Sequence, residues 1–381
     1  MVSADLVFPA SSSESLREIA AWDGFRSATL PPSEFPVDVL RFEGSSSPPI
    51  VLSRARRAES LKALPASLRE RALQAFARAE RPRTFLSLAR GRRLDLFSSP
   101  AVMGVVNVTP DSFSDGGLYF DEGRAVERAL EMFEEGAALV DIGGESTRPP
   151  AYGPAATVPA EEEIARVVPV VEGIRRASDC PVSIDTRKAA VARAALAAGA
   201  DLVNDVSALR YDPEMLPVLL EEDAAVLLMH MRGTDPSTMQ ADTFYTHPVA
   251  DVASELASAA SKAIEAGVAA DRIAVDPGLG FGKSLEGNLV LLRYLAAFRS
   301  LGFPVAAGAS RKAFVRRFSG VPDDAPVRDR LPGSLAALGA ARAAGAAVVR
   351  VHDVAESVRF LKLLDAIESP TVGQPAGAAV R

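Results

Sequence analysis

Arg350 and His352 stand two residues apart at the end of a short apolar run, so on a β-strand their side chains would point to the same face. A cationic guanidinium beside an imidazole suits an anion such as a phosphate group, because it can donate charge-assisted hydrogen bonds to the anion's oxygens. This pair therefore predicts a site for a phosphate-type group.

A second polar set consists of Asp185, Asn204 and Asp276, each at the end of another apolar run. Carboxylates accept paired N–H donors, and an asparagine both donates and accepts, so these side chains suit the edge of an amino-pyrimidine ring. Lys312 could bond a ring carbonyl or nitrogen, or it could neutralise one of the acids. The two sets together predict a ligand that carries a heterocycle and a phosphate-type group.

The loop DPGLGFGK, residues 276–283, contains three glycines and Phe281. We expect the glycines to allow close approach of the backbone to a flat ring, and Phe281 to form an apolar wall beside it. The spacing differs from that of a P-loop, so the loop is not expected to cradle phosphates.

Other kinds of chemistry find less support. The three histidines, His230, His247 and His352, show no zinc-ligand spacing. A Mg²⁺ ion held largely by substrate phosphate oxygens needs few protein ligands, and Asn107 could supply one oxygen. No G-x-S-x-G motif supports a serine nucleophile. Cys180 stands at a strand start and is predicted to be a core residue.

Eight short apolar runs, separated by segments of helical periodicity, must position these groups. The runs are Val102–Val106, Ala138–Ile142, Val182–Ile184, Leu202–Val203, Ala225–Met229, Ile273–Val275, Val305–Ala307 and Val348–Val351. Strands that alternate with helices predict a parallel sheet, and eight repeats over roughly 270 residues predict a closed (β/α)8 TIM barrel. An open doubly wound sheet is the alternative, but no G-x-G-x-x-G follows a strand.

The carboxyl ends of the strands carry the chemistry in a barrel, and every run here leads into hydrogen-bonding or charged residues. Asp, Asn and Ser at such places can also cap the following helix. Arginine and histidine are poor caps, so the end that carries Arg350 and His352 is the most informative. Eight polar strand ends together favour a binding site.

The composition narrows the classes of function. The chain has 381 residues, 48% of them hydrophobic, and a formal net charge of −7, which argues against a nucleic-acid partner. No apolar run approaches the roughly 18–20 residues of a membrane span, and the first residues do not resemble a signal peptide. The single cysteine cannot form an internal disulfide, which fits a reducing, cytoplasmic location.

Residues 1–95 differ from the rest of the chain in the distribution of their charges. They are predicted to be an N-terminal extension, partly helical, to which the sequence assigns no role. Residues 1–50 carry seven acids and three arginines, whereas residues 51–95 carry twelve basic residues and four acids. The basic stretch is interpreted as a solvated helical face, with an interaction arm as the alternative. Residues 96–368 form the predicted barrel, and residues 369–381 a disordered tail.

Eight motifs occur in order, one near each strand end: NVTPDSFSDGG, DIGGESTRP, SIDT, NDVSA, MHM, DPGLGFGK, GASRK and RVHDV. The ordered set, over about residues 95–368, resembles the dihydropteroate synthase family of the folate pathway. The resemblance implies a homodimeric (β/α)8 barrel that uses Mg²⁺. It implies a reaction that joins 6-hydroxymethyl-7,8-dihydropterin diphosphate to 4-aminobenzoate, forming 7,8-dihydropteroate and releasing diphosphate.

The resemblance also implies roles for individual residues. The pterin would be bound by Asp185, Asn204, Asp276, Lys312, Phe281, Met229 and Arg350. The diphosphate would be bound by Asn107, Arg350 and His352, with Asn107 as the metal ligand. The catalytic group would comprise Arg350, His352, Lys312 and Asp111.

Two mobile loops are implied, which here span Thr109–Gly117 and Ser146–Ala160. In the first, Phe113 would wall the aminobenzoate pocket and Asp111 would help organise the closed state. In the second, Thr147 and Arg148 would help close the site. A lid suits this reaction, because loss of diphosphate can leave a stabilised CH₂ cation that water would capture.

Three departures from the family pattern are expected to matter. Ala313 stands where many relatives have a serine that helps hold the aminobenzoate carboxylate, although a helix N-terminus could still bind it. The second loop is longer than usual and has Pro150 in place of a common glycine. The segment MRGTDPSTMQ is also slightly longer, which a loop tolerates.

Two other functions stand as alternatives. A pterin-dependent methyltransferase domain would share the barrel and the pterin-edge residues, but it would need neither NVTPDSFSDGG nor a diphosphate site. A non-catalytic pterin-binding protein, or a scaffold that holds a partner with the basic segment, would have lost lid or diphosphate residues. Asn107, Asp111, Arg350 and His352 are all present, which favours the synthase.

Overall fold

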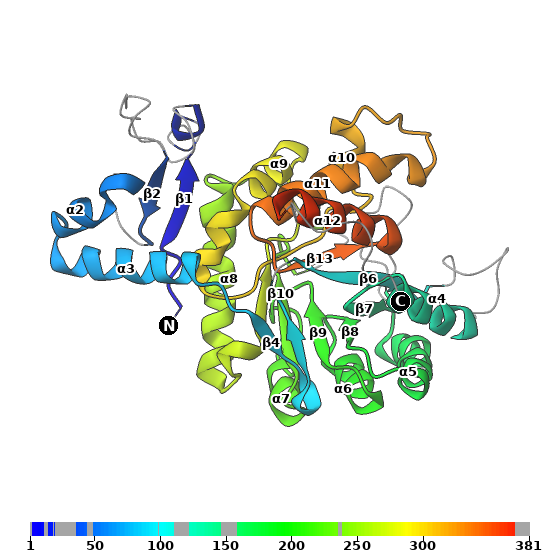
Figure 1. The fold of residues 1–381 in the computed structure, drawn as a ribbon. Helices are drawn as coiled ribbons and strands as arrows, with labels where there is room; N and C mark the ends of the chain where they lie inside the picture. Colours follow the sequence, from blue (N-terminus) through cyan, green and yellow to red (C-terminus); the bar gives the residue numbers. More distant parts are fainter. Residues whose placement is uncertain are drawn as a thin grey trace, which may run out of the picture.

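The computed structural model describes residues 2–10, 14–17, 19, 36–43, 49–97, 99–109, 122–145, 158–234 and 238–369. Its centre is a sheet of eight parallel strands surrounded by helices (Figure 1). The strands are β6 (Ala101–Asn107), β7 (Leu139–Gly143), β8 (Val182–Asp185), β9 (Leu202–Asp205), β10 (Ala225–Met229), β11 (Ile273–Asp276), β12 (Ala306–Ala307) and β13 (Val348–Val351). They coincide with the eight apolar runs, so the predicted (β/α)8 barrel is confirmed.

The sheet closes on itself. Its hydrogen-bonded neighbours follow the order β11-β10-β9-β8-β7-β6-β13-β12. Val275 in β11 then forms a parallel bridge to Val305, directly before β12. The Val275 amide donates to the Pro304 carbonyl at 2.9 Å. Closure brings all eight carboxyl ends to one rim, which an open doubly wound sheet would not do.

Helices between the strands cover the outside of the barrel (Figure 1). They are α4 (Glu122–Glu134), α5 (Ala160–Ala177), α6 (Ala189–Ala198), α7 (Met215–Glu221), α8 (Pro248–Ala266), α9 (Leu285–Arg293), the 3₁₀ segment η5 (Leu295–Leu301), α10 (Ala313–Phe318), α11 (Leu331–Ala343) and α12 (Val354–Glu368). Gly199 ends α6 with φ 122°, a conformation that favours glycine.

Side chains inside the barrel form an apolar floor and a polar rim. Alternate residues of a strand point inward, and the lower inward positions are apolar: Met103, Leu139, Leu202, Leu227, Ala274 and Val348. A hairpin of β4 (Phe85–Ser87) and β5 (Arg93–Asp95) closes this end, and Leu86, Leu88, Leu94 and Leu96 pack into the same cluster. Two residues further along four of the strands stand Asp141, Asn204, Asp276 and Arg350.

Cys180 is the one sequence-based core prediction that is wrong. The residue is only partly buried and lies in the turn between α5 and β8, one residue before Pro181. The turn runs over the end of the barrel, so the thiol does not enter the packed layer between strands and helices.

The N-terminal residues add a second, smaller layered unit beside the barrel (Figure 1). An antiparallel sheet joins β1 (Leu6–Ala10), β2 (Val37–Arg41) and β3 (Ile50–Ser53), and the helices α2 (Arg57–Lys62) and α3 (Ala66–Glu80) follow. Phe8 on the sheet meets Tyr294 of the barrel edge-on, with ring centroids 6.2 Å apart. The other face, through Val7 and Leu40, packs with Phe76 of α3. The sequence predicts helices in this region but not the three strands.

Opposite charges meet inside this unit. Asp38 is buried in β2 and accepts hydrogen bonds from Arg54 at 2.9 Å and from Arg57 at 3.1 Å. Asp5 is also buried and accepts from Arg71 Nε at 2.9 Å. These arginines therefore neutralise buried acids of the first 50 residues, while Arg54 and Arg71 keep 42% and 37% of their side-chain surface exposed.

A buried carboxylate ties the hairpin to the barrel. Asp201, fully buried just before β9, accepts hydrogen bonds from Arg90 at 2.8 Å and Arg92 at 3.0 Å, both next to the hairpin. Its other oxygen accepts from the Val182 amide at 2.9 Å and from Arg175 of α5. One side chain thus joins two strands, a helix and the floor of the barrel.

We predict that Asp201→Asn lowers the free energy of unfolding by about 3 kcal/mol, because three arginines lose the charge that they share. Thermal and urea unfolding measure the change. The matched control is Asp179→Asn, because Asp179 pairs with the same Arg92 but is almost fully exposed. Equal unfolding midpoints for the two variants would contradict this assignment.

Candidate active site

The polar rim gathers most of the residues that the sequence predicts as a site. Ten of them lie in the described part of the chain, at or just after the carboxyl ends of the strands: Asn107, Asp185, Asn204, Met229, Asp276, Phe281, Lys312, Ala313, Arg350 and His352. Asp111, Phe113, Thr147 and Arg148 lie outside the described residues, as does most of both predicted lid loops.

Arg350 links three strand ends across the rim. Its Nε donates to Asp141 Oδ2 at 2.6 Å, and its Nη2 donates to Asp185 Oδ2 at 2.8 Å. Asn204 Nδ2 donates to the same oxygen of Asp141 at 2.9 Å. Asp141 Oδ1 and Asn204 Oδ1 are buried without a partner in the described part of the chain, so each remains an acceptor. The rim therefore offers hydrogen-bond acceptors that a ligand can use.

Asp141 is a site residue that the sequence analysis does not single out. It is fully buried inside β7, and its register partner on β8 is Ser183. An aspartate within an apolar strand is rarely buried unless it is paired, and this could have identified it. What the sequence does not show is its partner, Arg350, which lies 209 residues away.

Burial shifts several of these groups toward neutrality. Burial raises the pKa of Asp185 to about 7, and it does so despite the opposing charge of Arg350. Burial also raises the pKa of Asp276, with Lys312 opposing. The pKa of Lys312 is lowered to about 8, again mainly by burial. The rim thus holds two acids and a base whose pKa values are shifted by burial, as is common at functional sites.

An apolar wall stands beside these polar groups. Met229 packs with Val206, Met231 and Met239, and Phe281 lies against this cluster. Lys312 Nζ sits 4.6 Å from the centroid of the Phe281 ring and donates to the Leu279 carbonyl. Sulfur and aromatic faces suit a flat heterocycle. Val206, Met231 and Met239 are additions to the predicted wall.

Two glycines of residues 276–283 have a packing role that the sequence analysis does not predict. A Cβ on Gly278 would lie 1.9 Å from the His230 carbonyl oxygen, and one on Gly282 would lie 2.2 Å from Arg232 Cβ. Both residues have positive φ, 67° and 66°. Gly278 and Gly282 therefore let this loop pack against the loop after β10. The close approach of the backbone to a flat ring stays a prediction.

Lys283 fixes the two loops together. Its buried Nζ lies 2.8 Å from His230 Nδ1 and donates to the carbonyls of His230 at 2.9 Å and Phe281 at 3.0 Å. Burial, and next the charge of Lys283, lower the pKa of His230 to about 4, so the imidazole is neutral. Its Nε2 faces Glu255 at 3.2 Å. The sequence analysis assigns no role to Lys283 or His230. In the structure, their contacts hold the loop that carries Phe281 against the end of β10.

A second lysine joins the two ends of the segment that contains the second predicted lid. Lys188 Nζ donates to Glu145 at 2.8 Å, on one side of that segment, and to the Val158 carbonyl at 2.7 Å, on the other. It also pairs with the buried Glu163 of α5. Burial raises the pKa of Glu163, and the hydrogen bond and charge of Lys188 oppose this rise. Lys188 therefore favours the charged form of the buried acid.

The remaining predicted groups lie at or after the ends of the neighbouring strands β6, β13 and β12. His352 follows β13, and its Nδ1 lies 3.1 Å from Ser310 Oγ. Asn107 ends β6, which pairs with β13, and it is half-buried. Ala313 is exposed at the start of α10.

Within the described ranges, no three His, Cys, Asp or Glu side chains form a metal-binding group. None of the described helices is long and apolar enough to cross a membrane.

Comparison with known proteins agrees with this geometry. The family model of the pterin binding enzymes matches residues 103–352. The dihydropteroate synthase of Haemophilus influenzae is 43% identical over 278 residues, which cover 73% of this chain and 97% of the relative. That of Synechocystis sp. is 42% identical over 266 residues, covering 70% and 89%.

Solved structures give the same picture. The Xanthomonas albilineans dihydropteroate synthase with 4-aminobenzoic acid matches with a TM-score of 0.68 and 43% identity, over 75% of this chain and 98% of that one. The Burkholderia cenocepacia dihydropteroate synthase complexed with 7,8-dihydropteroate matches with a TM-score of 0.66 and 42% identity, over 75% and 97%.

We predict that Gly278→Ala lowers the free energy of unfolding by about 3 kcal/mol or more, because a methyl group meets a backbone oxygen and φ is positive. Gly233→Ala is the matched control, since Gly233 has φ 71° but no atom lies within 4 Å of the place that the added methyl group would take. Its expected cost is only about 1 kcal/mol. If thermal unfolding gave the two variants the same midpoint, the close packing of the two loops would be refuted.

Proposed function

The chain belongs to the dihydropteroate synthase family of pterin-binding enzymes, and we propose from its rim geometry how its own residues carry the family's reaction. The enzyme condenses 6-hydroxymethyl-7,8-dihydropterin diphosphate with 4-aminobenzoate to 7,8-dihydropteroate and diphosphate, in folate biosynthesis. The observation that carries the assignment of roles is the bridge from Arg350 to Asp141 and Asp185 at the centre of the rim.

The pterin edge is assigned to Asp185, Asn204 and Asp276, which supply acceptors and an amide for the ring's N–H groups. Lys312 lies over Phe281 and donates to the ring's oxygen or nitrogen acceptor. The face of the pterin ring is assigned to Phe281 and to the apolar cluster of Val206, Met229, Met231 and Met239. Asp185 Oδ2 also accepts from Arg350 Nη2 at 2.8 Å, so the carboxylate assigned to the pterin edge is oriented by this arginine.

The diphosphate is assigned to Arg350, His352 and Asn107, which come from the neighbouring strands β13 and β6. Asn107 offers one amide oxygen, a donor that Mg²⁺ accepts when most of its ligands are phosphate oxygens and water. When bound, Mg²⁺ would neutralise charge on the diphosphate. Arg350 and His352 stabilise the charge that develops on the departing oxygen.

The reaction balances without a strong general base. The bond between the pterin CH₂ and the diphosphate oxygen breaks, and its electron pair leaves with diphosphate. The electron-rich dihydropterin stabilises the resulting cation. The aminobenzoate nitrogen gives its lone pair to the CH₂ carbon and then loses one proton, which the released diphosphate or water accepts. Water would capture the cation, so we assign closure to the two loops with Asp111, Phe113, Thr147 and Arg148, and the aminobenzoate side to Ala313.

We further propose that two copies of the chain associate through the helices α9 and α10. Large apolar side chains are exposed there on neighbouring helices, namely Leu285, Leu289 and Phe318. Burying them against a second copy removes apolar surface from water. We place the homodimer in the cytoplasm, because the single cysteine, Cys180, forms no internal disulfide.

The test of the proposed function is diphosphate release by the purified protein, given dihydropterin diphosphate, Mg²⁺ and 4-aminobenzoate, with each omitted in turn. We expect diphosphate and 7,8-dihydropteroate to form in equal amounts when all three are present. Arg350→Ala is expected to lower turnover by about 10²-fold or more, because the departing diphosphate loses the guanidinium that stabilises its negative charge.

Product formation at the wild-type rate by Arg350→Ala would overturn the role of this residue. Pterin binding without any product from the wild-type protein would favour the non-catalytic binding function instead. Activity that requires a methyl donor and no diphosphate would favour the methyltransferase alternative.

A further inference from the structure

The loops after β12 and β13 are joined by side chains that the proposed reaction does not use. Arg311 Nε donates to Asp353 Oδ2 at 3.0 Å, and its Nη2 donates to the other carboxylate oxygen. One residue earlier on each loop, Ser310 Oγ accepts from the His352 amide at 3.2 Å. Residues 310–311 are therefore tied in register to residues 352–353. A two-pronged arginine–carboxylate pair fixes orientation as well as distance.

Arg311 is held in an unfavourable backbone conformation. Its φ is 61°, in the left-handed region that non-glycine residues rarely occupy. Its amide donates to Ser334 Oγ at 3.0 Å, and its carbonyl accepts from Arg330 at 2.8 Å. Such a conformation persists only where the surroundings over-determine it. Here the surroundings are the two backbone contacts and the ion pair with Asp353.

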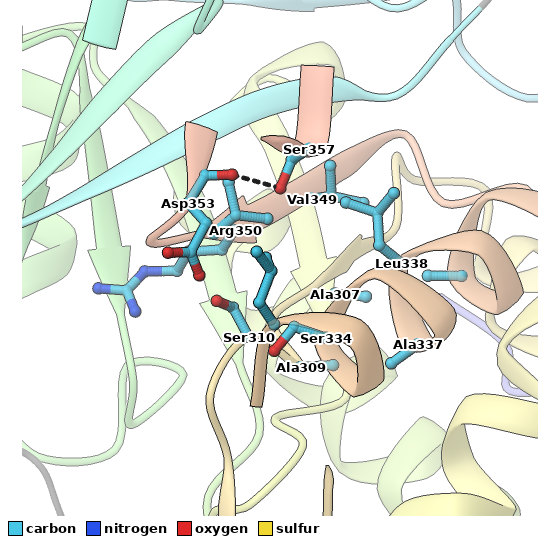
Figure 2. Close-up of a pocket in the computed structure, with 13 residues that line it drawn as sticks. Ala307, Ala309, Ser310, Ser334, Ala337, Leu338, Val349, Arg350, Asp353 and Ser357 are labelled. Atoms are coloured by element: carbon cyan, nitrogen blue, oxygen red, sulfur yellow. Dashed lines mark hydrogen bonds between the residues drawn. The ribbon is translucent and has the colours of Figure 1, made fainter. Parts of the chain in front are cut away.

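A narrow pocket lies behind these loops, between β13 and α11, and it is lined mostly by alanine, serine and valine side chains. Figure 2 shows Ser310 and Ser334 on one side of this pocket, with Asp353 and Ser357 on the other. Ala307, Leu338 and Val349 of this lining are buried in the core of the barrel. The polar contacts therefore add orientation to loops that are also held by packing.

We propose that Arg311 and Asp353 form a latch that fixes Lys312 relative to Arg350 and His352, and that both latch residues are positioning residues for the condensation. The inference rests on the proposed function of the rim. Lys312 directly follows Arg311, and Asp353 directly follows His352. The latch thus joins the group assigned to the heterocycle to the groups assigned to the departing diphosphate. Neither latch residue touches a substrate in this assignment.

The latch matters to rate more than to pterin binding. Asp185, Asn204 and Asp276, to which the pterin edge is assigned, lie on β8, β9 and β11. Within the described part of the chain, Arg311 and Asp353 make no hydrogen bond to these strands. A loosened latch lets the groups around the breaking C–O bond shift. A displacement of about 1 Å in such groups can cost about 10²-fold in rate.

The experiment compares Asp353→Asn, Arg311→Gly and the double variant with wild type. Asp353→Asn removes the charge and keeps the size. Arg311→Gly removes the latch, and glycine accepts the positive φ of this position without strain. Asp365→Asn is the matched control, because Asp365 also pairs with an arginine, Arg342, at 2.6 Å, but near the far end of α12.

Three quantities are measured for each protein: kcat for condensation, affinity for 6-hydroxymethyl-7,8-dihydropterin without diphosphate, and the midpoint of thermal unfolding. For both single variants we expect kcat to fall about tenfold or more, with pterin affinity within about threefold of wild type. The double variant should be no slower than the slower single variant, since the pair acts as one unit. Asp365→Asn should keep its kcat.

Wild-type kcat in Asp353→Asn would overturn the inference. So would additive effects of the two substitutions, or a fall in kcat accompanied by equal losses of pterin affinity and thermal midpoint, because that pattern describes a merely structural pair. An inactive wild-type protein would instead refute the proposed function on which the latch rests.

Discussion

Arg350 is the common counter-ion of two carboxylates at the barrel rim, and the rest of the site is arranged around this pairing. Asp141 is fully buried and Asp185 nearly so, and they lie on adjacent strands. Two such acids could not be held side by side without a cation that reaches both. The apolar floor and the hairpin below it exclude water from the other end. The polar groups of the barrel interior are therefore concentrated at the rim, where a ligand can enter.

Loops around the rim are fixed by cations that reach from one strand end to the next. Lys283 joins the β11 loop to the end of β10, Lys188 joins the ends of the segment after β7, and Arg311 joins the β12 loop to the β13 loop. Donors and acceptors held in place before the ligand arrives need no reorganisation during the reaction. The N-terminal unit takes no part in this arrangement, since it packs on Tyr294 and its neighbours on the outside of the barrel.

The sequence predicts much of this because its strongest signals are local. Runs such as Val102–Val106 are short, apolar and separated by helical periodicity, so the barrel and its strand ends could be derived. The barrel topology then brings Asp185, Asn204, Asp276 and Arg350 together although they are far apart in sequence. Contacts between residues far apart in the sequence leave no such local pattern. The pairing of Asp141 with Arg350 and the three strands of the N-terminal unit depend on contacts that no local pattern shows.

The proposed function requires Asp141 to hold Arg350 in its orientation at the rim. The most direct test is kcat/KM for dihydropterin diphosphate in Asp141→Asn, which keeps the side chain's size and removes its charge. We expect a loss of about tenfold or more, with a folded protein and a smaller change in the KM for 4-aminobenzoate. An unchanged kcat/KM in a folded variant would contradict the claim, because Arg350 would then be oriented without its buried partner.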